Sequence, residues 1–262
     1  MNQNLSATDI AVERDGFVTV VEICRPPHNF FSLELIRSLA DIFAALDTDP
    51  ECRCILLAAQ GSSFCAGADF SSRERSVVPA QQQKSNPLYD EAVRLFACLK
   101  PVVAAVHGPA IGGGLGLAVM ADFRVTCKEA RFSANFNRLG FHPGFGLTVT
   151  LPRLVGVQKA ALLFYSGRRI GGEEAVAIGL ADFLVAQDQV RAEAMKLAQE
   201  IAGSAPLAVV STRTTLRLGL ADQVRAATAR EGAEQGWQYM TEDFKEGVAA
   251  MSQRRAPRFK GK

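Results

Sequence analysis

Two short segments of the chain combine small residues in a way that would expose backbone N–H groups. The first reads Phe64-Cys65-Ala66-Gly67-Ala68-Asp69, and the second follows an apolar run and reads His107-Gly108-Pro109-Ala110-Ile111-Gly112-Gly113-Gly114. Each is typical of a strand end that leads through a loop into a helix. Glycine and alanine allow a ligand to approach closely, and the first turn of a helix has no internal acceptors for its N–H groups. Two such donors aimed at one point would form an oxyanion hole.

The residues and the order of the two segments resemble those of the crotonase, or enoyl-CoA hydratase/isomerase, superfamily. The resemblance extends from about Phe17 to Phe259. Members of this family hold an acyl-CoA thioester carbonyl between two peptide N–H groups and stabilise the enolate that forms. The resemblance implies that the donors here are the N–H groups of Ala68 and Gly113. It also implies that the substrate site is lined by Cys65, Ala66, Gly67, Gly112, Phe136, Phe141 and Gly144.

The sequence differs from the hydratases at both positions where they carry catalytic glutamates. Gly116 and Phe136 stand there, and Gly144 stands where dienoyl isomerases and a dehalogenase carry an aspartate. Hydration of an enoyl thioester needs a general base and a general acid, each contributing about 10²- to 10⁴-fold, whereas an oxyanion donor contributes about 10²- to 10³-fold. We therefore expect thioester binding and enolate stabilisation without ordinary hydratase turnover.

Two functions remain open on this basis. The first is an acyl-CoA-processing lyase or isomerase whose reaction depends mainly on the enolate: double-bond isomerisation, decarboxylation of a malonyl-type thioester, or carbon–carbon bond chemistry. The second is a catalytically silent subunit that binds CoA thioesters. In both cases coenzyme A is part of the substrate, and no separate cofactor is expected.

Several residues near the two loops have a chemical and a structural interpretation. His142, in a Gly/Pro-rich turn, is the first candidate for a replacement proton carrier, although an isolated histidine there is more often structural. Nothing near Cys65 in sequence would lower its pKa, so we expect a buried thiol and not a nucleophile. Asp69 is expected to cap the helix that follows it. The rings of Phe136, Phe141 and Phe145 are candidates for an apolar lining.

The run Gly112–Gly116 is also similar to a dinucleotide-binding loop. That loop requires the spacing G-x-G-x-x-G within a strand–helix–strand unit. Position 117 is leucine, so the last glycine is out of register and this interpretation is not favoured.

Composition narrows the remaining possibilities. The 262 residues carry a formal net charge of +2 with basic residues spread along the chain, which disfavours nucleic-acid binding. No apolar run approaches the roughly 18 residues of a membrane span, and the start lacks a leader pattern, so we expect a cytoplasmic protein. The six cysteines show no pairing typical of a metal site. The basic tail Arg254–Lys262 is either a solvated end or lies near ligand phosphates.

The periodicity of the sequence predicts an α/β fold. We expect a hairpin over Ile10–Cys24, a helix capped by Ser32, a buried strand over Cys54–Ala59, and a polar loop or frayed helix over Ser71–Asn86. The remaining expected elements are a helix at Tyr89–Leu99, strand–loop–helix at Val102–Ala121, a strand at Phe123–Cys127, and helices at Gln158–Ser166, Glu173–Ile178, Gln189–Ala202, Pro206–Leu218 and Leu220–Ser252.

This repeating order fits the crotonase-like superhelix of strand-strand-helix units followed by a C-terminal helical region. We expect an acyl-CoA-binding core over 1–200 and a helical region over 201–262 that, by the resemblance, makes oligomer contacts and closes the site. A homo-oligomer, either a trimer or a hexamer, follows from the same resemblance.

Overall fold

The computed structural model describes residues 9–68 and 86–262. The predicted cap at Asp69 and the predicted polar stretch, apart from Asn86, lie outside these residues. The two stretches described contain the whole of the main sheet and the loop ends that carry the expected oxyanion donors.

The main sheet has six strands in the order β1-β2-β3-β4-β6-β9. β1 (Ile10–Asp15) and β2 (Val18–Ile23) form the predicted antiparallel hairpin. From β2 onward the neighbours run parallel through β3 (Cys54–Ala59), β4 (Val102–Val106), β6 (Phe123–Cys127) and β9 (Phe183–Val185). β3 and β4 are buried at every position, as their continuous apolar sequences predict for central parallel strands.

A second, smaller sheet lies beside the expected site. It consists of β5 (Ala110–Ile111), β7 (Arg131–Ser133) and β8 (Ile170–Gly171). The chain passes from β4 of the main sheet to β5 of the small sheet and then into the helix α3 (Gly113–Met120). The expected α/β fold with strand-strand-helix units is confirmed, and the strand ends are where the small-residue loops begin.

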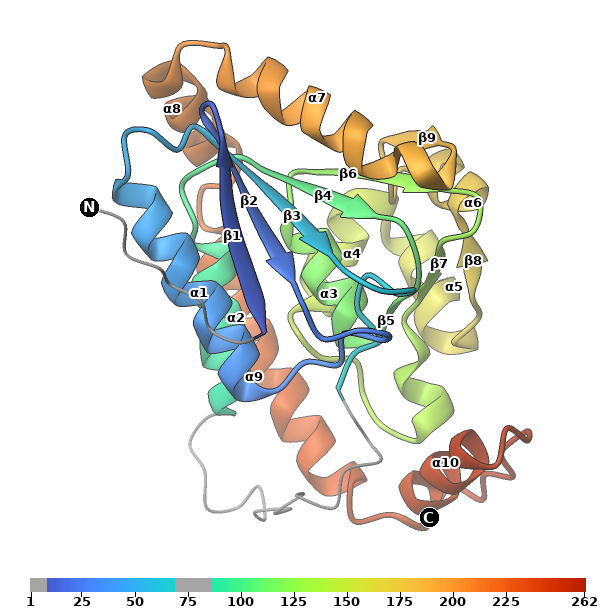
Figure 1. Ribbon diagram of the computed structural model, residues 1–262. Coiled ribbons are helices and arrows are strands. Elements are labelled where there is room, and N and C mark those ends of the chain that lie inside the picture. Colours follow the sequence, from blue (N-terminus) through green and yellow to red (C-terminus); the bar gives the residue numbers. More distant parts are fainter. Residues whose placement is uncertain (1–8, 69–85) are drawn as a thin grey trace.

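Helices cover both faces of the main sheet (Figure 1). α7 (Val190–Ala202) crosses one face and contacts β2, β3, β4 and β6. On the other side lie α1 (Leu33–Thr48), α2 (Pro87–Phe96) and α3. Ser32 caps α1 as predicted, because its hydroxyl accepts the N–H of Leu35.

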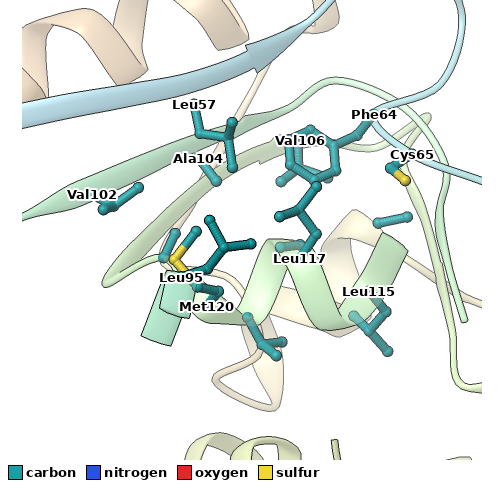
Figure 2. Close-up of a cluster of buried hydrophobic side chains, with 14 of the residues drawn as sticks. Leu57, Phe64, Cys65, Leu95, Val102, Ala104, Val106, Leu115, Leu117 and Met120 are labelled. Atoms are coloured by element: carbon teal, nitrogen blue, oxygen red, sulfur yellow. The ribbon is translucent and has the colours of Figure 1, made fainter. Parts of the chain in front are cut away.

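The core beneath the site is a layer of aliphatic and aromatic side chains between strands and α3. Every residue of α3 is buried, which is why it shows no polar face. Figure 2 shows Leu117 on the side of α3 that faces Val106 and Phe64. This packing fixes the start of α3, where Gly113 lies, relative to the strand ends.

The C-terminal third is helical, with two differences from the prediction. α4 (Leu147–Val155) was not predicted, and the expected helix over Leu220–Ser252 is two helices. The first ends at Gln238, and Thr241 caps the second by accepting the N–H of Phe244. The helices here are α5 (Val157–Ser166), α6 (Gly172–Ala177), α8 (Pro206–Leu216), α9 (Leu220–Gln238) and α10 (Glu242–Ser252), with short 3-10 turns η2 (Asn135–Leu139) and η3 (Gln187–Gln189).

The basic tail folds back on α10. The Glu246 carboxylate pairs with the Arg255 guanidinium and accepts the N–H of Arg258, and the Asp243 carboxylate accepts the N–H groups of Lys260 and Gly261. The tail is therefore tied to acidic groups. Residue 200 lies inside α7, and the division into 1–200 and 201–262 stays a prediction.

Candidate active site

The two small-residue loops are joined by backbone hydrogen bonds. Cys65 N–H donates to the Pro109 carbonyl at 3.0 Å, and Ile111 N–H donates to the Cys65 carbonyl at 3.0 Å, forming a parallel bridge between Cys65 and Ala110. The segments are far apart in sequence, yet these bonds align them side by side. They extend the small sheet by one bridge and bring the loop before Ala68 against the loop before Gly113.

Glycine is required where the loops meet. Gly67 has φ +85°, and a Cβ at this position would lie 2.8 Å from the Ile111 carbonyl oxygen and 3.7 Å from the Gly113 nitrogen. Gly112 has φ +57°, and a Cβ on Gly114 would collide with the Cys65 carbonyl. Larger residues would push the loops apart. The structure therefore brings together four of the predicted residues: Cys65, Gly67, Gly112 and Gly113.

Phe31 links the two expected donors. Its backbone N–H donates to the Gly67 carbonyl at 3.0 Å and it forms a parallel bridge with Ala68. Its ring lies against Gly113 so closely that a Cβ there would collide with it. Within residues 9–68 and 86–262, the hydrogen bonds provide no acceptor for the N–H of Ala68 or of Gly113, which is the first residue of α3.

The space beside Gly116 is filled by Phe145. A Cβ on Gly116 would lie 2.7 to 2.8 Å from three atoms of the Phe145 side chain. Phe145 is 1 % exposed, has φ +63°, and its ring lies 5.7 Å from that of Phe31. An aromatic ring thus stands where the first hydratase glutamate would begin.

The other missing carboxylate is replaced by an aromatic cluster. The Phe136 ring lies edge-on to Phe141 at 5.6 Å, and a Cβ on Gly112 would lie 3.8 Å from it. Phe141 packs in turn against Tyr239 at the end of α9 and Phe244 of α10. Phe136 and Phe145 therefore lie near the second loop, at Gly112 and Gly113, while Phe141 connects this region to the C-terminal helices.

The third position, Gly144, is also closed. A Cβ there would collide with the Tyr89 hydroxyl and lie 2.6 Å from the Gln235 Nε2. The Tyr89 hydroxyl donates to Gln235 Oε1 at 2.7 Å, and burial raises its pKa well above the ordinary value. Tyr89 is thus a neutral hydrogen-bond donor. Tyr89 and Gln235 were not predicted as site residues, and the only signal for them in the sequence was the glycine at 144.

His142 is half-buried and its orientation is defined. Its Nδ1 lies 2.8 Å from the Pro143 carbonyl oxygen, and its backbone N–H donates to Gln238 Oε1 at 2.6 Å. A carbonyl only accepts, so Nδ1 carries the proton and Nε2 has the free lone pair of a potential base.

Cys65 and His107 have structural roles in the two loops. Burial raises the pKa of the Cys65 thiol to about 12, which agrees with an inert buried thiol. The Nε2 of His107 lies 3.0 Å from the Gly61 carbonyl oxygen and ties the ends of β4 and β3. Within the described ranges, no group of three or more His, Cys, Asp or Glu residues could hold a metal ion. No helix in these ranges is long and apolar enough to cross a membrane.

Two cavities lie away from the expected donors Ala68 and Gly113. One of about 690 Å³ lies between α10 and the folded-back tail, and one of about 470 Å³ lies between the ends of β3 and β4 and the start of α7. Neither is lined by Ala68, Gly113 or the three phenylalanines. The candidate active site is therefore assigned from the backbone geometry of the two loops and not from a cavity.

Comparison with known proteins agrees with this geometry. The family model for enoyl-CoA hydratase/isomerase matches residues 13–262. The chain belongs to the enoyl-CoA hydratase/isomerase family, and its membership of the crotonase superfamily is confirmed. Family membership supports an enzyme of this type, and the reaction has to be argued from the site.

Individual relatives cover nearly the whole chain. It is 33 % identical over 98 % of its length to a probable enoyl-CoA hydratase of Bacillus subtilis, covering 100 % of that protein. It is 32 % identical over 96 % of its length to a short-chain-enoyl-CoA hydratase of Clostridium acetobutylicum, covering 97 % of that protein. A crystal structure of an enoyl-CoA hydratase/isomerase from Pseudoalteromonas atlantica superimposes with a TM-score of 0.86 at 32 % identity, covering 96 % of this chain and 100 % of that one.

Proposed function

We propose that this protein is an acyl-CoA-processing lyase or isomerase that binds a thioester carbonyl between the N–H groups of Ala68 and Gly113. The observation that carries the proposal is the hydrogen-bonded pair of loops, which holds two N–H groups without an acceptor among the described residues beside one phenylalanine, Phe31. Donors fixed before the reaction stabilise the oxyanion as it forms, by about 10²- to 10³-fold each.

The reaction that fits the remaining residues passes through an enolate. Transfer of an α-proton to a base, or loss of the α-carboxylate as CO2, leaves the bonding electron pair on the α-carbon. This pair is delocalised onto the thioester oxygen, to which the two N–H groups donate. Protonation of the carbon then ends the reaction. Water activation by glutamates is not part of this scheme, because Gly116 and Phe136 carry no carboxylate and aromatic rings stand at both places.

His142 is our candidate for moving the proton. The contact of Nδ1 with the Pro143 carbonyl leaves Nε2 as the basic atom. A His142→Ala variant should lose about 10²-fold or more in kcat. The His142→Gln variant keeps a polar side chain of similar reach but cannot act as a base, so equal loss in both assigns the effect to proton transfer. Retained activity in both would exclude His142.

The acyl group is proposed to be bulky and apolar, since Phe31, Phe136 and Phe145 surround the donor loop. Buried apolar surface contributes about 25 cal/mol per Å². Benzoyl-CoA should therefore bind at least about tenfold more tightly than acetyl-CoA, which corresponds to about 1.4 kcal/mol. Equal affinities in calorimetry would mean that only the CoA portion is recognised.

A panel of acyl-CoA thioesters, read by mass spectrometry and by the ultraviolet absorbance of the conjugated thioester, tests the function as a whole. The panel contains crotonyl-CoA, a 3-enoyl-CoA, a malonyl-type CoA and cyclic acyl-CoAs. An enzyme changes the mass or the double-bond position of at least one of them. Binding of cyclic acyl-CoAs with no conversion across the panel would favour the second candidate, a catalytically silent thioester-binding subunit, to which the missing carboxylates also point. A homo-oligomer and a cytoplasmic location complete the proposal.

A further inference from the structure

α9 presents a row of polar side chains toward the segment 142–148. Glu231, Gln235 and Gln238 are spaced as i, i+4 and i+7, which places them on one face of the helix. Glu231 is 0 % exposed and Gln235 is 1 % exposed. Because burying a polar side chain is unfavourable unless it is hydrogen-bonded, the partners of this row indicate its role.

All three side chains bind backbone groups of one short segment. Gln238 Oε1 accepts the N–H of His142 at 2.6 Å, and Gln235 Nε2 donates to the His142 carbonyl at 2.9 Å and the Pro143 carbonyl at 3.3 Å. The Glu231 carboxylate accepts the N–H of Gly146 at 2.8 Å. It also accepts the N–H of Thr148 at 3.0 Å and the hydroxyl of the same residue at 2.6 Å.

The segment held in this way has a backbone that needs support. Phe145 has φ +63°, a left-handed conformation that is unfavourable for a residue with a side chain, and Gly146 follows at φ +73°. Glu231 binds the N–H directly after Phe145, and Gln235 binds the carbonyls before Gly144. The row thus fixes the peptide group directly after Phe145 and the two peptide groups that precede Gly144.

The position of Phe145 determines the shape of the expected acyl site. Its side chain fills the space beside Gly116, and one ring atom lies 3.7 Å from the place of a Cβ on Gly113. A rotation of the backbone at Phe145 would move this ring away from the start of α3. Gln235 is further fixed from two sides, because Oε1 accepts the hydroxyl of Tyr89 on α2 and that of Tyr239.

We propose that Glu231, Gln235 and Gln238 are positioning residues that hold Phe145 in its left-handed conformation and thereby set the selectivity of the site for its acyl group. The inference rests on the proposed function, because it assumes that the acyl group lies beside Gly113. It adds that residues of α9 determine which acyl groups fit, by acting on the backbone of the segment 142–148.

The test compares Gln235→Leu with Gln223→Leu, a matched change at an exposed glutamine of the same helix. Hydrogen exchange is measured for the segment 142–148, and calorimetry gives the affinities for benzoyl-CoA, acetyl-CoA and free CoA. In Gln235→Leu we expect exchange at least about tenfold faster in this segment. We also expect the ratio of benzoyl-CoA to acetyl-CoA affinity to fall at least about threefold, with unchanged affinity for free CoA. Gln223→Leu should match the wild type.

The outcomes separate this inference from the proposed function. Wild-type protein that binds none of the three ligands contradicts both. Wild-type selectivity that persists in Gln235→Leu overturns the inference alone, whether or not exchange becomes faster. Unchanged exchange would show that Gln235 does not hold the segment 142–148, which also overturns the inference. If Gln235→Leu does not fold, Gln238→Leu removes one hydrogen bond at a half-buried position, and it should change exchange and selectivity in the same direction by a smaller amount.

Discussion

At the scale of single residues, other side chains occupy the space that the missing catalytic carboxylates would need. Gly116 has no side chain, and Phe145 packs into the volume that a side chain there would need. Gly144 is similarly covered by Tyr89 and Gln235. Glycine at each position is thus part of a packed arrangement, and a single substitution cannot restore the hydratase residues.

Restoring hydration should require several changes together. Gly116→Glu alone collides with Phe145, and overpacking of this kind costs about 1–3 kcal/mol of stability. The combined variant Gly116→Glu, Phe136→Glu, Phe145→Ala has two carboxylates and the necessary space. It should hydrate crotonyl-CoA at least about 10²-fold faster than the wild type and than the control with Gln at 116 and 136 and Ala at 145. Fast hydration by the wild type would show that another group already moves the protons.

Cys65 should be unreactive in the folded protein. It is 0 % exposed, and burial raises its pKa to about 12. Because the thiolate is the reactive form, iodoacetamide at pH 8 should label the half-buried Cys24 first. Cys65 should react only after denaturation, as read by peptide mass spectrometry. Rapid native labelling of Cys65 would show that the loop before Ala68 is open.

At the scale of elements, the sequence predicted those helices and strands whose bounds depend on nearby residues, such as an apolar run or an N-cap. β3 has the predicted bounds, and α1 begins after its own cap at Ser32. α4 escaped prediction because its N-terminus has no local side-chain cap; Glu231, 83 positions from Thr148, supplies the acceptor. The two donor loops were recognisable from small residues, whereas the ring of Phe145 was not placed beside Gly116, since its left-handed backbone depends on α9.

The Glu231 cap predicts a pH dependence of stability. Burial raises the pKa of this carboxyl above its ordinary value of 4.5, although the Thr148 and Gly146 donors lower it. A group whose pKa is higher in the folded state contributes stability that is fully present below the unfolded pKa and is lost as the pH rises through the folded pKa. The free energy of unfolding of the wild type relative to Glu231→Gln should therefore decrease from pH 4 upward. A difference that increases over this range in chemical denaturation would contradict the raised pKa, because it would mean that the hydrogen bonds from Gly146 and Thr148 outweigh the effect of burial.

At the scale of the whole molecule, apolar side chains remain exposed on the C-terminal helices. Leu207 of α8 is 86 % exposed, Tyr165 of α5 is 82 % exposed, and Leu218, between α8 and α9, is 79 % exposed. Large apolar side chains this exposed would be covered if the C-terminal region makes oligomer contacts. We expect a trimer or a hexamer, measured by light scattering at micromolar concentration. A monomer under these conditions would contradict the expectation.

The central claim, that two N–H groups bind a thioester carbonyl, can be tested with variants that separate the N–H from the packing. Proline at 113 would remove one donor, and the first position of a helix tolerates proline. Any side chain there collides with Phe31, however. Phe31→Ala makes room, so that Phe31→Ala/Gly113→Ala keeps the N–H and Phe31→Ala/Gly113→Pro lacks it.

The most direct measurement is the infrared carbonyl frequency of bound benzoyl-CoA labelled with ¹³C at the thioester carbon. A carbonyl polarised by two fixed donors absorbs at a lower frequency than in water. We predict this lower frequency in the wild type and in Phe31→Ala/Gly113→Ala, and a partial return toward the value in water in Phe31→Ala/Gly113→Pro. A bound carbonyl with the same frequency as in water in the wild type would contradict the oxyanion hole at Ala68 and Gly113.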